Sequence, residues 1–121
     1  MNQPDAHDLL LTAREAVLKQ LLPALPTHLH YEARMVASAL LIASRELAQG
    51  PSCAAIERQA LASLLQGQAL PEEQARHELA QRIRRGAYDP MGEARSRLLM
   101  ALRAINRAQL SIDNPKVLAH D

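Results

Sequence analysis

Apolar residues recur along the chain at intervals of three and four, which is the spacing of one face of an α-helix. Prolines, glycines and capping residues divide this pattern into five segments. We therefore expect an all-α protein, a compact bundle of about five helices joined by short connections. The expected helices span roughly residues 5–22, 27–50, 52–67, 71–86 and 89–110.

Local signals set these boundaries. Asp5 is a candidate N-cap for the first helix, and Pro23 interrupts that helix after Leu22. Gly50 is followed by proline and predicts the end of the second helix, while Gly86 is a natural C-terminal stop for the fourth. The inner face of the first helix is expected to carry apolar side chains at Leu9, Leu10, Ala13, Val17 and Leu21.

The second expected helix carries the broadest apolar face. At about 100° per residue, and with Arg34 at zero, its apolar positions form an arc from about 80° to 240°. The arc contains Met35, Val36, Ala39, Leu40, Ile42, Ala43, Glu46 and Leu47. Such a width predicts a helix packed against several neighbours at the centre of the bundle.

Beside this arc lies a narrower stripe. Arg34, Ser38 and Arg45 fall within about 40° of one another, because eleven residues make about three whole turns. The stripe is either the solvated side of an amphipathic helix or a recognition surface for carboxylates or a phosphate group.

Glu46 is unusual because its position falls inside the apolar arc. A buried carboxylate needs a partner or becomes neutral. We expect either a structural ion pair with Arg82, Arg84 or Arg85, or a side chain that reaches water near the helix end.

Composition supports the helical assignment. The 121 residues include 21 Leu and 22 Ala, but neither Phe nor Trp and few β-branched residues. This composition argues against β-rich folds and against base stacking on aromatic side chains. We expect a single helical domain over residues 1–121, with a core at about 5–110 and a C-terminal tail at 111–121.

The N-terminus lacks a basic region typical of a signal peptide, and no apolar run approaches the length of a membrane span. The lone Cys53 fits a reducing compartment. We therefore expect a cytoplasmic protein.

Catalytic and ligand motifs are not found in the sequence. It contains no glycine-rich phosphate loop and no nucleophile elbow. His28 and His30 are two residues apart and diverge on a helix, and Cys53 has no histidine close in sequence. The residues thus indicate neither a metal, nor a cofactor, nor an enzyme.

Positive charge collects locally although the whole chain carries only +1. Residues 76–107 contain eight Arg against three acidic residues. This basic segment is interpreted as a solvated face, as a surface for an anion or partner, or as a site for duplex DNA. A nucleic-acid-binding regulator is accordingly the alternative to a protein-binding function.

Four stretches, taken in order, resemble a known family. They are residues 22–26 (LPALP), 34–47 from Arg34 to Arg45-Glu46-Leu47, 83–89 (IRRG followed by Asp89) and 110–115 (LSIDNP). Their order and spacing resemble a bacterial family of small helical proteins of unknown function. Its members are encoded beside aminoglycoside-phosphotransferase-like kinases and acyl-CoA dehydrogenases, and the resemblance covers roughly residues 4–116.

The resemblance implies a non-catalytic accessory subunit of a phosphotransferase-like hydroxyacyl-CoA kinase used in hydroxy-acid catabolism. The candidate partner- or anion-binding residues are Arg34, Ser38, Arg45, Arg84, Arg85 and Asn114. Ser38 stands where the family is expected to carry Asn, which places any specific contact at that position in doubt. The expected partners are the kinase subunit, an acyl-CoA at the joint surface, and a second copy of the chain.

Overall fold

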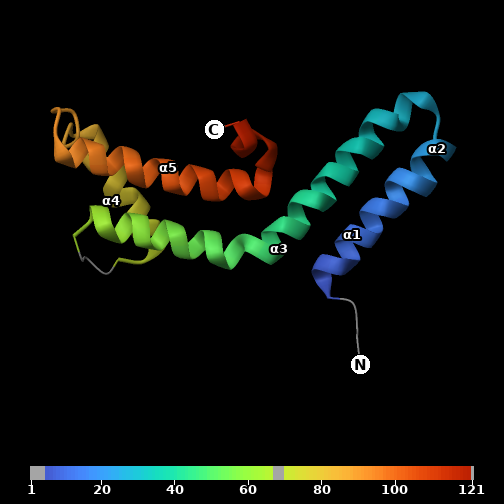
Figure 1. Ribbon diagram of the computed structural model, residues 1–121, viewed down its shortest axis with the longest axis horizontal. Helices are drawn as coiled ribbons and strands as arrows, with labels where there is room; N and C mark the ends of the chain where they lie inside the picture. The colour runs from blue at the N-terminus through green and yellow to red at the C-terminus, as the bar shows by residue number, and fades with distance from the viewer. Residues whose placement is uncertain (1–4, 67–69, 121) are drawn as a thin grey trace. The chain divides into compact units, whose positions relative to one another are not determined.

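The computed structural model describes residues 5–66 and 70–120, and all the secondary-structure elements of these residues are helices, without a β-strand (Figure 1). The elements are α1 (Ala6–Ala16), η1 (Val17–Leu21), α2 (Leu22–Ala24), η2 (Thr27–Leu29), α3 (His30–Leu64), α4 (Glu72–Arg84), α5 (Glu93–Asp113) and η3 (Pro115–His120). The prediction of an all-α protein is confirmed. Residues 111–120, expected as a tail, are largely helical because α5 continues to Asp113 and η3 follows.

The expected number of about five helices is wrong, since the described residues form four helices of substantial length. The difference arises because the segments expected at 27–50 and 52–67 are one continuous helix, α3, with Pro51 inside it. Proline removes one helical hydrogen bond, but packing on both sides can outweigh that loss. Before Pro51, the Ser44 carbonyl contacts His7 of α1, and after it the Cys53 thiol donates to the Ala108 carbonyl of α5.

Two compact units divide the chain, Met1–Pro51 and Ser52–Asp121. In the first unit, α1 lies alongside the first part of α3 (Figure 1). A hydrogen bond connects the two helices, because a ring nitrogen of His7 on α1 lies 2.9 Å from the Ser44 carbonyl oxygen on α3. At the other end of the unit, a ring nitrogen of His30 lies 2.9 Å from the Leu25 carbonyl oxygen and closes the loop. This unit is a helical hairpin, and we call it the hairpin unit.

The hairpin unit buries a face of α3 that lies about 120° around the helix from the centre of the predicted one. Its buried residues within 5–51 are all small, namely Ala33, Ala37 and Ser44. The predicted core arc is largely exposed, with Met35 at 53%, Val36 at 51%, Ile42 at 37% and Leu47 at 52%. Of the expected inner residues of the first helix, Leu9 on α1 and Leu21 at the end of η1 are likewise exposed. Small side chains let two helices approach closely, and the residues of α3 that are buried in this unit are accordingly two alanines and a serine rather than the larger apolar residues.

The turn of π-helix at Val17–Leu21 has a local cause in Pro23. A proline ring clashes with the carbonyl four residues earlier in a regular helix. Here the helix widens, and the Leu22 N–H donates to the Val17 carbonyl, one residue farther back than in an α-helix. Pro23 therefore lies within α2 instead of ending the helix before it.

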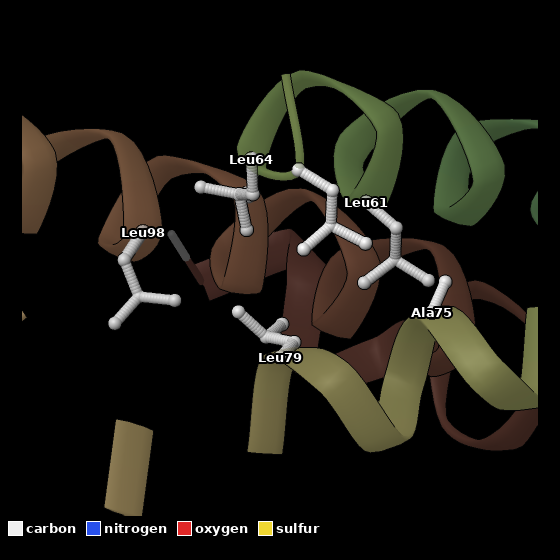
Figure 2. Close-up of a cluster of buried hydrophobic side chains, with 7 residues drawn as sticks. Leu61, Leu64, Ala75, Leu79 and Leu98 are labelled. Atoms are coloured by element: carbon white, nitrogen blue, oxygen red, sulfur yellow. The ribbon is translucent and has the colours of Figure 1, made fainter. Parts of the chain in front are cut away.

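The second unit contains the larger core. Leucines of α3 and its C-terminal end pack against α4 and α5, as Figure 2 shows for Leu61, Leu64, Leu79 and Leu98. The small side chains of Ala75 and Ala101 complete the cluster, and Tyr88 and Ile105 pack against it. Burial of these side chains from three helices provides the main hydrophobic stabilisation of this unit.

Two predicted end signals are confirmed. The Asp5 carboxylate accepts a hydrogen bond of 2.8 Å from the Asp8 N–H at the start of α1. At the end of α4, Gly86 has φ +79° and donates to the Ile83 carbonyl, while Ala87 donates to the Arg82 carbonyl. This pair of bonds is the Schellman arrangement, in which glycine adopts the left-handed conformation at little cost.

Candidate functional site

The candidate residues of α3 lie in the hairpin unit. Arg34 and Ser38 are exposed, whereas Arg45 is half-buried and makes contacts with other residues. Because all three stand on one α-helix, they share a face over three turns, and the two arginines are about 16 Å apart along the axis. That separation suits two carboxylates on a facing helix better than a single phosphate group.

Glu46 is exposed, contrary to its placement within a buried arc. Its carboxylate lies next to Gly50, where a Cβ would come within 3.1 Å of Oε1. Of the arginines predicted as its partners, Arg82 and Arg85 contact Glu78 instead, at 3.1 and 3.5 Å. The structure therefore places Glu46 at the solvent-facing surface of α3.

The remaining candidates lie at helix ends in the second unit. Arg84 is the last residue of α4 and is exposed. The Arg85 side chain donates to the Gln81 carbonyl at 3.3 Å. Asn114 is the C-cap of α5, and its backbone N–H donates to the Leu110 carbonyl at 2.8 Å. Cationic side chains at the end of α4 also interact favourably with the helix dipole.

Much of the basic segment 76–107 is neutralised by nearby acidic side chains. Arg76 bridges α4 to α3 through two hydrogen bonds to Glu57, of 2.5 and 2.7 Å. Arg76 lowers the pKa of Glu57 below its ordinary 4.5, chiefly through this hydrogen bonding. Arg97 contacts Glu93 at 2.5 Å. These pairs favour the interpretation of the segment as a structural and solvated surface.

An open apolar groove in the second unit was not predicted from the sequence. The groove has a volume of about 550 Å³ and lies between the C-terminal part of α3 and α5. Its apolar lining consists of Ile56, Ala60, Met100, Ala101 and Ala104. Its polar lining consists of Gln59, Ser63 and Arg97. We call it the α3–α5 groove.

One sequence signal was available for this groove. Leu98, Leu99 and Met100 are consecutive, and successive residues on a helix point about 100° apart, so the three cannot all face one core. Leu98 is buried at 8% exposure, whereas Leu99 is 45% and Met100 70% exposed. Of these two outward side chains, Met100 lines the groove and is the apolar residue by which the sequence could have indicated it.

Cys53 is a half-buried thiol whose Sγ donates to the Ala108 carbonyl at 3.2 Å. Across residues 5–66 and 70–120, no three His, Cys, Asp or Glu side chains gather where they could hold a metal ion. None of the helices in these ranges is both long and apolar enough to cross a membrane.

Comparison with known proteins yields one family. The model of a domain of unknown function, DUF6285, matches residues 23–117, which include α3, α4 and α5. No curated protein and no solved structure matches the chain. The match covers most of the chain and spans both units. The chain therefore belongs to the DUF6285 family.

Proposed function

We propose that this chain is a non-catalytic accessory subunit that docks onto a larger partner, a phosphotransferase-like acyl-CoA kinase. The observation that carries the docking role is the α3–α5 groove, with Met100 70% exposed at its edge. The identity of the partner rests on the resemblance of the four sequence stretches described above.

The shape and chemistry of the groove suit a helix of the partner. Ala60, Ala101 and Ala104 are small, so the backbone of an incoming helix can approach closely. Methionine is flexible and polarizable and adapts to the side chains that cover it. Arg97 contributes a charged group to the lining, where interfaces are commonly polar.

The exposed arginines supply the second part of the proposal. Arg34 on α3 and Arg84 at the end of α4 are exposed and available to carboxylates of the partner, or to the phosphates of an acyl-CoA at the joint surface. Bidentate contacts of this kind fix the orientation of two proteins more than they add affinity.

Two experiments test the proposal. The first is copurification of this chain with the tagged kinase subunit, and the second is a kinase assay on a hydroxyacyl-CoA. Met100→Glu is expected to reduce complex formation at least about tenfold, because it places a charge in the apolar groove. Met91→Glu is the matched control, since Met91 is 86% exposed and outside the groove lining. Arg34→Ala tests the polar contact in the same assay.

The outcomes separate the two candidate functions. A wild-type chain that neither binds the kinase subunit nor raises its turnover would contradict the accessory role. Retention on duplex DNA at low salt, weakening steeply as salt is added, would support the nucleic-acid-binding regulator instead. In that case Met100→Glu would bind DNA as wild type does, or only slightly more weakly.

A further inference from the structure

Arg103 on α5 differs from most arginines of the basic segment because its charge is not paired. Six of the eight arginines in residues 76–107 have an interaction partner, whereas Arg84 and Arg103 have none among residues 5–66 and 70–120. Arg103 is exposed, and residues 94–112 of α5 contain no acidic side chain that could approach it along the helix. The next acidic residue of α5, Asp113, accepts a hydrogen bond of 3.1 Å from Gln109.

Arg103 lines a recess within the second unit, between α5 and η3. The recess has a volume of about 410 Å³, which lies in the range of small-molecule sites. Its lining consists of Arg103, Asn106, Arg107, Leu110 and Val117. The four residues from α5 fall within about 100° of one another around the helix and so share one face. The fifth comes from η3, which turns back beside the end of α5 (Figure 1). We call this site the α5–η3 recess.

We propose that the α5–η3 recess binds an organic phosphate, a phosphate monoester that carries an apolar organic group. Arg103 and Arg107 are one turn apart, about 6 Å along the helix axis, so both guanidinium groups can reach one anion. This spacing contrasts with the separation of Arg34 and Arg45, which is too large for a single phosphate group. The inference concerns a ligand of this chain alone, goes beyond the proposed accessory function and does not depend on it.

The donors of the recess match a phosphate monoester better than a carboxylate. Each guanidinium is a planar fork that pairs with two oxygens, and a phosphate monoester offers three terminal oxygens and a charge of about −2. A carboxylate offers two oxygens and a single charge. The side-chain amide of Asn106 supplies a further donor beside the two arginines.

The charge and the carbon surface of the recess both favour such a ligand. Two like charges one turn apart disfavour a helix, and a bound dianion removes that repulsion. Arg107 also interacts with another group of the chain, so Arg103 is the arginine whose donors remain open. Leu110 is half-buried and Val117 is 44% exposed, and they present an apolar wall to the organic part of the ligand.

Titration calorimetry of the purified full chain at low ionic strength tests the proposal with three probes. Phenyl phosphate is expected to bind with a dissociation constant below about 1 mM. Inorganic phosphate should bind at least about threefold more weakly, because it lacks the group that contacts the apolar wall. Benzoate, which has the ring but a carboxylate, should bind at least about tenfold more weakly than phenyl phosphate.

Substitutions on α5 assign the binding to the recess. Arg103→Ala is expected to weaken phenyl phosphate at least about tenfold, and Arg103→Lys, which keeps the charge but not the planar fork, should fall between it and wild type. Arg95→Ala is the matched control, since it removes the same charge from the same helix outside the recess and should bind within about twofold of wild type. Val117→Ser should weaken phenyl phosphate but not inorganic phosphate. Circular dichroism establishes that each variant is folded.

Several results would overturn the proposal. Wild type that does not bind phenyl phosphate at about 10 mM has no such site. Equal losses in Arg95→Ala and Arg103→Ala would indicate a general attraction of anions to α5. Benzoate or inorganic phosphate binding as tightly as phenyl phosphate would exclude an organic phosphate as the preferred ligand. Displacement of phenyl phosphate by duplex DNA, with DNA binding lost in Arg103→Ala, would assign the recess to nucleic acid instead. Each measurement uses this chain alone, so the kinase copurification is judged independently.

Discussion

Replacing Leu79 by alanine tests whether the second unit is stabilised by the core seen in the structure. Leu79 on α4 is 6% exposed and packs among the leucines of α3 and α5 (Figure 2). The substitution removes three carbon atoms, worth about 2.4 kcal/mol in transfer free energy at about 0.8 kcal/mol each. The cavity that remains adds to this, so the expected loss in unfolding free energy is about 3–4 kcal/mol.

Leu99→Ala is the matched comparison, because Leu99 is also helical but 45% exposed. About half of its side chain already contacts solvent, so the expected loss is about 1 kcal/mol. Urea unfolding followed by far-UV circular dichroism measures both values, and the melting temperature of Leu79→Ala should fall by about 12–16 °C. If Leu79→Ala were no more destabilising than Leu99→Ala, the packing of α4 against α3 and α5 would be refuted.

Two further substitutions address polar and backbone features of the second unit. Because Arg76 lowers the pKa of Glu57, their pairing stabilises the fold above pH 4.5 and its contribution is lost as the pH falls through the lower value in the folded state. Glu57→Gln should therefore lower the free energy of unfolding by about 1 kcal/mol at neutral pH. Urea unfolding at acidic pH should show a smaller difference between the variant and wild type. A difference that does not change with pH would contradict the role of the ion pair. Gly86→Ala should lower the free energy of unfolding, measured by thermal unfolding, by about 1–2 kcal/mol. The reasons are that φ of Gly86 is +79° and that the added Cβ would lie 2.9 Å from an Asp89 carboxylate oxygen. A substitution without effect on stability would argue against the left-handed conformation at this position.

Local sequence information predicted the helical class and several helix ends correctly. The cap at Asp5 and the stop at Gly86 depend only on neighbouring backbone groups, so they were visible in the sequence. The combined signal of Gly50 and Pro51 failed, since α3 continues through both residues.

The tertiary structure alone decided which helical faces are buried. Periodicity identifies an apolar stripe but not the neighbour that covers it, and in the hairpin unit Ala33 and Ala37 are buried while Met35 and Ile42 remain exposed. The α3–α5 groove likewise depends on residues distant in sequence, since Ile56 and Met100 come from different helices. Sequence thus determined that the chain is helical and where several of its helices end, because those properties arise from local interactions. The surfaces proposed to bind partners required the tertiary structure, because they arise from what the core leaves uncovered.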